Sequence, residues 1–317
     1  MDNGQEMMRF VHVTKEFDLT AGKLRAVWDM NLSIARGECV AIVGESGCGK
    51  STFARMAAGI EPVSDGEILY QGKKIADFHR NELREFRRRV QMIFQEPGSV
   101  FSPKMRIGAF LMEPWINFEK KSRREAREMA LYGLERVGLS GEYFSRYPHQ
   151  LSGGELQRIA IARAIALHPN LLICDEATSA LDVSVQREVI DLLKEHQREA
   201  DFAVLFICHD LALAEDFGNR VVVMYLGCVM EILEGKELKR NAEHPYTRAL
   251  LDSVFSIHDD PGNEIYVLPG EPPSPVNLPE GCLFCARCGR AGDICRREAP
   301  KLRCRGGEHW VACHMLE

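Results

Sequence analysis

The sequence lacks a long hydrophobic run. None of its apolar stretches approaches the ~20 residues that a helix needs to cross a bilayer. The first ten residues, MDNGQEMMRF, also lack the apolar core of a secretion signal. We therefore expect a cytosolic protein, in which any role at a membrane depends on partners.

The excess of one sign of charge is also small. Charged residues make up 27% of the 317 residues and the net charge is −6, a balance that provides no overall attraction for nucleic acid or anionic lipid. Two basic clusters, Arg87–Arg89 and residues 120–124, are more typical of solvated helix faces than of binding patches. We find no internal repeat, and the length suits one large domain with an appendage or two ordinary domains.

The strongest signal is the stretch VAIVGESGCGKST at residues 40–52. An apolar run ends in a glycine, four residues and then Gly-Lys-Ser, the pattern of a phosphate-binding loop. Lys50 can neutralise the β- and γ-phosphates, Ser51 offers a hydroxyl to Mg²⁺, and the following helix directs its N-terminus at the anion. The alternative is a glycine-rich turn with an incidental lysine. The motif between a strand and a helix predicts nucleoside triphosphate binding, with close backbone approach at Gly44, Gly47 and Gly49.

Hydrophobic periodicity predicts a doubly wound α/β core. Short strand-like pieces within residues 9–35 and at 66–70 indicate a small antiparallel layer beside that core. Residues from about 100 to 166 have a helical pattern. The remaining expected elements are buried strands at 90–94, 171–174, 203–208 and 221–224, and helices at 123–137, 154–167 and 184–200.

Polar side chains follow three of these strands. Asp175 and Glu176 come directly after the strand at 171–174, at the edge where an open α/β sheet places its ligands. Asp175 is suited to hold Mg²⁺ and Glu176 to take a proton from an attacking water. His209 and Gln95 end two other strands and could face the γ-phosphate or Mg²⁺. Taken alone, they would be a structural histidine and an ordinary loop glutamine.

A second anion cradle is indicated by Ser152, Gly153 and Gly154, which open a helix. The alternative is an ordinary helix cap. Because one chain with one nucleotide does not need two cradles, the simplest arrangement is a dimer in which each cradle closes on the partner's nucleotide.

The motifs GESGCGKST, LSGGELQ, ICDE and SALD, with Gln95 and His209, resemble those of ATP-binding cassette (ABC) ATPases over residues 8–240. The resemblance implies a RecA-like core with an antiparallel β subdomain and an α-helical subdomain at about 100–166, within a cassette spanning residues 1–242. It implies Glu176 as general base, His209 as switch histidine and Gln95 as a catalytic and Mg²⁺-binding residue. Glu155 replaces the commoner glutamine. The residues implied to bind ATP or Mg²⁺ are Phe17, Gly44, Ser46, Gly47, Cys48, Gly49, Lys50, Ser51, Thr52, Gln95 and Asp175, with Ser152, Gly153, Gly154 and Glu155 reaching the opposite ATP and Ser179–Asp182 at the dimer seam.

Residues 243–317 resemble the C-terminal extension of oligopeptide and dipeptide importer ATPases, through His244-Pro245-Tyr246-Thr247, the Gly-Glu-Pro-Pro at 270–273 and the following cysteines. This implies a peripheral subunit on the cytoplasmic face of the membrane. Its partners would be a second ATPase, two permease subunits and an extracytoplasmic solute-binding protein, with no nucleic acid. The alternatives are an importer of nickel or another small solute in the same branch, or a soluble cassette ATPase acting on nucleic acid or ribosomes.

Six of the eleven cysteines fall after residue 281, and in a reducing compartment such a cluster indicates a metal or iron–sulfur site before disulfides. The other five are scattered through apolar or motif segments, as small buried residues are. The family resemblance implies four ligands for a [4Fe-4S] cluster, with Zn²⁺ as the alternative. Cys285 and Cys304 leave the ligand choice open, and the implied set is Cys282, Cys288, Cys295 and Cys313.

Overall fold

The computed structural model describes residues 6–178, 181–253, 270 and 272–316. Two residues of the expected dimer seam, Ser179 and Ala180, lie outside this range, as does most of the segment between residues 254 and 271.

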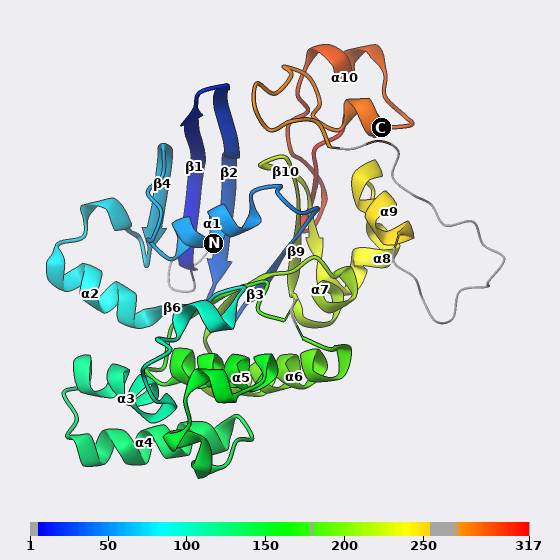
Figure 1. The fold of residues 1–317 in the computed structure, drawn as a ribbon. Coiled ribbons are helices and arrows are strands. Elements are labelled where there is room, and N and C mark those ends of the chain that lie inside the picture. The colour runs from blue at the N-terminus through cyan, green and yellow to red at the C-terminus, as the bar shows by residue number, and fades with distance from the viewer. Residues whose placement is uncertain (1–5, 179–180, 254–269, 271, 317) are drawn as a thin grey trace.

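A mixed sheet forms the centre of the described structure (Figure 1). Its strands are β3 (Cys39–Val43), β6 (Val90–Ile93), β7 (Leu171–Asp175), β8 (Ala203–Ile207), β9 (Arg220–Tyr225), β10 (Cys228–Glu234), β11 (Arg303–Gly306) and β12 (His309–Val311). Their order is β11-β12-β10-β9-β3-β8-β7-β6, with β9, β3, β8, β7 and β6 parallel. The remaining pairs are antiparallel, so residues near the C-terminus complete one side of the sheet.

Helices cover both faces of the parallel strands, which explains why β3, β7 and β8 are buried along their whole length. On one face, Ala41 and Val43 pack in a core with residues of α5 (Gly153–Ile165), α6 (Val183–Ala200) and α7 (Leu211–Phe217). On the other face, Val40 and Ile42 pack with α1 (Lys50–Ala57) and the antiparallel layer. This alternation confirms the expected α/β fold class.

The antiparallel layer consists of β1 (Glu6–Leu19), β2 (Gly22–Ala35), β4 (Asp65–Tyr70) and β5 (Lys73–Lys74), in the order β2-β1-β4-β5. The sequence predicted several short strands within residues 9–35, whereas the structure has two long ones. Their pairing contains register shifts, and His12 and Asp29 adopt positive φ angles of 50° and 48°. Such irregularities interrupt the apolar alternation, so continuous strands look like separate pieces in the sequence.

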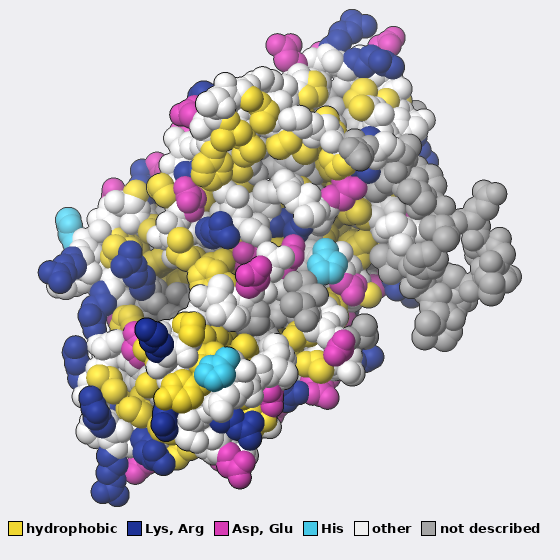
Figure 2. All heavy atoms as spheres, in the orientation of Figure 1, with side chains coloured by type: hydrophobic (Ala, Val, Ile, Leu, Met, Phe, Trp, Pro, Cys, Tyr) yellow, Lys and Arg dark blue, Asp and Glu magenta, His cyan; other side chains and the backbone are white. Residues whose placement is uncertain are grey.

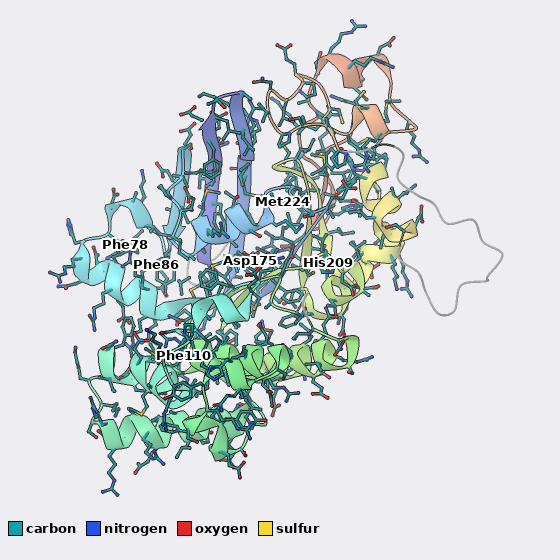
Figure 3. All side chains as sticks on the ribbon, viewed as in Figure 1. Phe78, Phe86, Phe110, Asp175, His209 and Met224 are labelled. Carbon is teal, nitrogen blue, oxygen red and sulfur yellow. The ribbon has the colours of Figure 1, made fainter. Side chains whose placement is uncertain are left out.

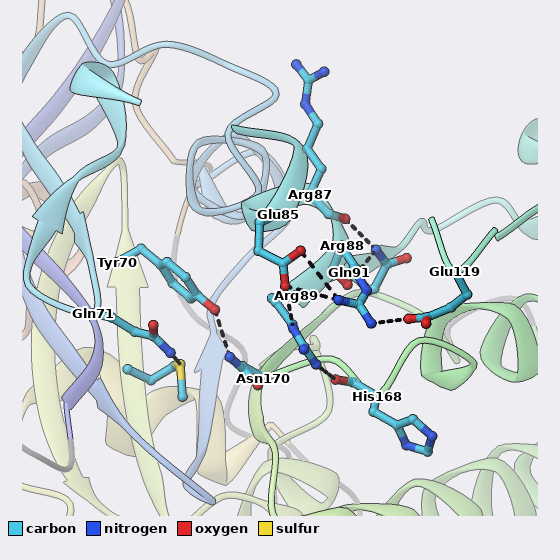
Figure 4. A network of polar contacts seen from close by, with 11 residues as sticks. Tyr70, Gln71, Glu85, Arg87, Arg88, Arg89, Gln91, Glu119, His168 and Asn170 are labelled. Atoms are coloured by element: carbon cyan, nitrogen blue, oxygen red, sulfur yellow. Dashed lines mark hydrogen bonds and ion pairs between the residues drawn. The ribbon is translucent and has the colours of Figure 1, made fainter. Parts of the chain in front are cut away.

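The basic cluster Arg87–Arg89 differs from the expected solvated helix face. It ends α2 (Arg80–Arg89), and two of its three arginines are half-buried and bonded (Figure 4). Arg89 bonds Glu85 at 2.9 Å and donates to the carbonyl of His168 at 3.1 Å. Arg88 pairs with Glu119. The cluster therefore joins α2 to segments elsewhere in the fold.

Between β6 and β7 the described chain is helical, with α3 (Ile107–Asn117) and α4 (Arg123–Arg136) preceding α5 (Figure 1). On the face shown in Figure 2, lysine and arginine side chains are most frequent along the edge formed by α2, α3 and α4. No helix among the described residues has the length and apolarity to cross a membrane. The last helices are α8 (Leu238–Asn241), α9 (Pro245–Asp252) and α10 (Asp293–Arg297).

Candidate nucleotide site

The phosphate loop connects β3 to α1, as the motif predicts. Lys50 is 4% exposed, and its ammonium group donates hydrogen bonds to the carbonyls of Gly44 at 2.7 Å and Glu45 at 3.0 Å. It also forms an ion pair at 3.9 Å with Glu176, which follows β7. These two hydrogen bonds fix the Lys50 ammonium group against the start of the loop. Because an ammonium group has three donors, it can also contact a bound phosphate.

Two glycines of the loop are required by the space around them. A Cβ on Gly49, whose φ is +104°, would lie 1.9 Å from the carbonyl oxygen of Ala26. A Cβ on Gly44 would lie 2.2 Å from that of Met224. Both distances are far below van der Waals contact. The strands on either side thus press against the backbone of the loop, and only glycine fits there.

The ends of β6 and β7 bring the predicted polar residues together. The Ser51 hydroxyl donates a 2.8 Å hydrogen bond to Asp175, and the Gln95 amide donates a 2.7 Å hydrogen bond to Glu176. Burial raises the pKa of Asp175, and the hydrogen bond from Ser51 opposes this shift. Hydroxyl, carboxylate and amide oxygens are the ligands that Mg²⁺ prefers. The residue types at this position fit the metal.

His209 lies at the end of the neighbouring strand. Asp175 is paired with Ile207 in the β7–β8 ladder, and the Glu176 N–H donates to the Ile207 carbonyl at 3.0 Å. In the view of Figure 3, Asp175 and His209 lie at the same height, below α1 and above α5 and α6. The His209 side chain is exposed to solvent. The predicted neighbourhood of the acidic pair and the histidine is therefore present.

A pocket of about 240 Å³ opens over the loop. Phe17, which the family resemblance implies as an ATP-binding residue, forms part of its wall together with Gln95 and Glu176. The Lys15 ammonium lies 4.9 Å from the Phe17 ring centroid. Further lining residues are Ser46, Gly47, Gly49, Lys50, Ser51, Thr52, Leu24, Arg25, Ala26, Leu226 and Pro275.

Cys48 belongs to the loop, but it is buried and does not line the pocket. Burial raises the pKa of its thiol.

The second predicted cradle lies away from this pocket. Ser152 is the N-cap of α5, and its hydroxyl and backbone N–H donate to Glu155 at 2.8 and 2.7 Å. Tyr143 also donates to Glu155. Ser152 and Gly153 are exposed, and none of the residues 152–155 lines the pocket within the described structure. The helix cap that the sequence allowed is thus present, and the exposed cradle does not serve this chain's own loop.

The thiols of the C-terminal region differ in environment. Cys295 is buried, and Cys282, Cys285, Cys288 and Cys313 are half-buried, whereas Cys304 is exposed. Burial raises the pKa of Cys282 to about 11, and neighbouring Cys295, Cys285 and Cys288 add to the shift. Within the described residues, no three His, Cys, Asp or Glu side chains form a group placed to hold a metal ion. The donor chemistry fits a thiolate site, but the present arrangement is not a formed one.

Sequence reasoning missed the contacts that C-terminal residues make with the nucleotide site. Arg287 forms an ion pair with Glu45 of the phosphate loop, and the Tyr246 hydroxyl accepts from the Glu45 N–H. Pro275 lines the pocket, and Val276 bridges to Leu24. In the sequence, the only features that could have indicated these contacts are Glu45 within the phosphate loop and Arg287 between two cysteines.

Comparison with known proteins identifies the same two parts of the chain as the sequence motifs do. Residues 27–179 match the family model described as ABC transporter, and residues 230–295 match that of the oligopeptide/dipeptide transporter C-terminal region. The dimeric post-hydrolysis structure of the ATP-binding cassette MJ0796, bound to ADP and Pi, superposes with a TM-score of 0.67. It is 31% identical and covers 72% of this chain and 98% of its own.

Curated relatives extend the similarity over nearly the whole chain. The probable peptide ABC transporter ATP-binding protein y4tS of Sinorhizobium fredii is 44% identical, covering 98% of this chain and 90% of the relative. The oligopeptide transport ATP-binding protein OppF of Escherichia coli is also 44% identical, covering 92% of this chain and 87% of the relative. These findings confirm the resemblance seen in the motifs. The chain belongs to the ABC transporter family and is one of its ATP-hydrolysing cassettes, in the oligopeptide/dipeptide branch.

Proposed function

We propose that this chain powers the import of dipeptides or oligopeptides across the cytoplasmic membrane. The observation that carries the proposal is the presence, in one polypeptide, of a complete set of ATP-site residues and the C-terminal region of peptide transporters. In this proposal the cassette spans residues 1–242 and the extension residues 243–317. The subunit is peripheral on the cytoplasmic face, beneath two permease subunits that receive the peptide from an extracytoplasmic solute-binding protein.

Hydrolysis in the proposed site is a transfer of the γ-phosphoryl group to water. Lys50 and the loop N–H groups hold the phosphates, and Ser51, Asp175 and Gln95 are the residues that would hold Mg²⁺. When bound, Mg²⁺ neutralises charge on the phosphate oxygens. Glu176 accepts a proton from the attacking water. The oxygen of that water forms a bond to the γ-phosphorus, and the bond between the γ-phosphorus and the ADP oxygen breaks. Gln95 keeps the Glu176 carboxylate in place, since the two side chains are already hydrogen-bonded.

The proposed working form is a heterodimer with a second ATPase. Ser152 and Gly153 are exposed at the start of α5, where they can reach a nucleotide on another subunit. Each ATP then binds between two chains, and ATP binding favours the closed dimer because the closed state completes its contacts. His209, exposed at the end of β8, is the proposed sensor of the γ-phosphate in that state.

The extension is proposed to hold a [4Fe-4S] cluster through Cys282, Cys288, Cys295 and Cys313, with Zn²⁺ as the alternative. These four cysteines, and Cys285 as well, are buried or half-buried, whereas Cys304 is exposed with its thiol 3.7 Å from the Gly307 carbonyl. Four thiolates are the ligand set for either group. The role is structural, because the tail has little apolar core of its own and metal binding can supply its folding free energy.

Uptake assays test the proposed function. Cells that lack this chain should lose uptake of labelled tri- and tetrapeptides, and the unaltered chain should restore it while Glu176→Gln does not. Loss of ⁶³Ni²⁺ uptake with normal peptide uptake would instead identify the nickel alternative. Normal uptake of both, together with RNA on the purified protein, would assign the chain to the nucleic-acid class.

A further inference from the structure

An arginine of the cysteine-rich extension contacts the phosphate loop. Arg287 lies between Cys285 and Cys288 and is only 6% exposed. Its guanidinium forms two parallel hydrogen bonds with the Glu45 carboxylate, at 2.7 Å and 3.0 Å. This bidentate geometry fixes the carboxylate in direction as well as in position. Glu45 is the second residue of the phosphate loop, between Gly44 and Ser46.

A tyrosine holds the backbone of the same residue. The Tyr246 hydroxyl, from α9, accepts a 2.9 Å hydrogen bond from the Glu45 N–H. Tyr246 is fully buried, and its ring lies 4.7 Å from that of Tyr225 and 5.3 Å from that of Phe284. Arg287 also donates to the Tyr225 hydroxyl at 3.4 Å. The side chain and the main chain of Glu45 are therefore both bound by buried groups of the C-terminal part.

The phosphate loop needs such an external support. Ser46 and Gly47 are exposed, Gly47 has a φ of +78°, and no atom lies within 4 Å of a Cβ built on it. Packing therefore does little to hold this part of the loop. Its N–H groups must nevertheless point at the phosphates, and their direction follows from the peptide at Glu45. A fixed Glu45 removes freedom that ATP would otherwise have to remove on binding.

Arg287 has a second effect, which is electrostatic. The Glu45 carboxylate is an anion within the segment that must receive a polyanionic phosphate chain, and like charges disfavour each other at short range. The paired guanidinium neutralises this carboxylate. Without Arg287, the loop would present an uncompensated negative charge to ATP.

We propose that Arg287 is a positioning residue for ATP: through Glu45, with Tyr246 as a second anchor, the cysteine-rich extension holds the phosphate loop in its binding conformation. The extension is then part of the ATP site. This inference rests on ATP binding at the loop and is independent of the transported solute.

The test compares Arg287→Met with Arg297→Met in the full-length chain. Arg297 is an exposed arginine of the same extension and serves as the matched control. We expect Arg287→Met to raise both the Kd and the KM for Mg-ATP roughly tenfold, since a charge-assisted pair is lost, with kcat changed less than about twofold. Arg287→Lys should restore part of the affinity, because lysine keeps the charge but not the bidentate geometry. Arg297→Met should leave all values unchanged.

Two further variants distinguish loss of the Arg287–Glu45 contact from general misfolding. Glu45→Gln removes the charge, so adding it to Arg287→Met should recover affinity relative to Arg287→Met alone. Tyr246→Phe removes only the hydroxyl that accepts from Glu45 and should weaken ATP binding in a chain that remains folded. Equal Kd values for Arg287→Met and Arg297→Met in folded protein would overturn the proposal. So would strictly additive losses in the double variant.

A separate arm distinguishes failure of the inference from failure of the proposed function. If the unaltered chain and Lys50→Ala bind Mg-ATP equally weakly, the loop is not the ATP site and the proposed function fails with it. If the unaltered chain binds ATP and Lys50→Ala does not, the function stands, and the Arg287 comparison decides the inference alone.

Discussion

The Gln95 amide donates a 2.7 Å hydrogen bond to the Glu176 carboxylate, which joins the segment just beyond β6 to the residue that follows β7. The two side chains come from segments that are separated in sequence by the helices α3, α4 and α5. The hydrogen bond therefore links the start of that helical part to the proposed general base.

Glu176→Gln should bind ATP but lose turnover. The substitution keeps the size of the side chain and removes its ability to accept a proton, so we expect kcat to fall by about 10²–10⁴-fold. The measurement is phosphate release together with ATP binding. Glu195→Gln, at an exposed carboxylate of α6, is the control and should have normal turnover. Unchanged phosphate release in Glu176→Gln would remove Glu176 as the base.

Ser51→Ala should raise the Mg²⁺ concentration needed for ATP hydrolysis, by roughly tenfold. The Ser51 hydroxyl is hydrogen-bonded to Asp175, so its removal deletes one oxygen ligand and frees the carboxylate that it orients. A Mg²⁺ titration at saturating ATP measures the effect. The control is Thr20→Ala at an exposed turn, and equal Mg²⁺ dependence in both variants would contradict the role of Ser51.

Glu231 is expected to be essential for stability. It is 0% exposed and accepts hydrogen bonds from the backbone N–H of Glu243 at 2.7 Å and of His244 at 3.2 Å, while His309 lies 2.8 Å away. Glu231→Gln leaves a buried donor without an acceptor and should lower the free energy of unfolding by about 2 kcal/mol. Urea unfolding measures this. Glu234→Gln, at an exposed position of the same strand, should change it by less than about 0.5 kcal/mol.

The lowered pKa of His244 predicts that the protein becomes less stable in weak acid. Burial lowers the pKa of His244 to about 4, from an ordinary value of about 6.5. Below the ordinary value the unfolded chain binds a proton that the folded chain does not, so stability falls as the pH drops from about 6.5 towards 4. Between pH 7.5 and 5.5 this contributes about 1 kcal/mol.

Urea unfolding of the unaltered chain and of His244→Asn at both pH values isolates this effect. Asparagine can still cap α9 by accepting from the Tyr246 N–H, as His244 does at 3.1 Å. The difference between the two proteins should therefore change by about 1 kcal/mol over this range. A pH-independent difference would show that His244 is not the group responsible.

The cysteine proposal predicts an iron and sulfide content. Anaerobically purified protein should contain about four iron and four sulfide per chain if a [4Fe-4S] cluster is bound, and about one zinc in the alternative. Cys295→Ser, at the buried thiol, should abolish the metal, whereas Cys304→Ser, at the exposed thiol, should retain it. Retention in Cys295→Ser would exclude the proposed ligand set.

Local patterns predicted much of the nucleotide site. The glycine spacing of the phosphate loop and the acids after a buried strand each follow from one continuous segment, so Lys50, Asp175 and Glu176 could be placed from the sequence. The Arg287–Glu45 pair joins residues 242 positions apart, and no local pattern indicates it. Strand β12 could not be predicted either, because a strand of three residues has too little periodicity to be recognised.

Strand β12 pairs with β10 at Glu231 and Ile232, and thereby covers an edge of the sheet that also contains the phosphate-loop strand. During translation, β10 is made long before residues 309–311 emerge. For that interval the nascent chain has an open, pairing-competent edge, which is the kind of surface that chaperones protect and proteases attack. A substitution that prevents β12 from pairing would therefore leave this edge open in the finished chain and favour aggregation and proteolysis.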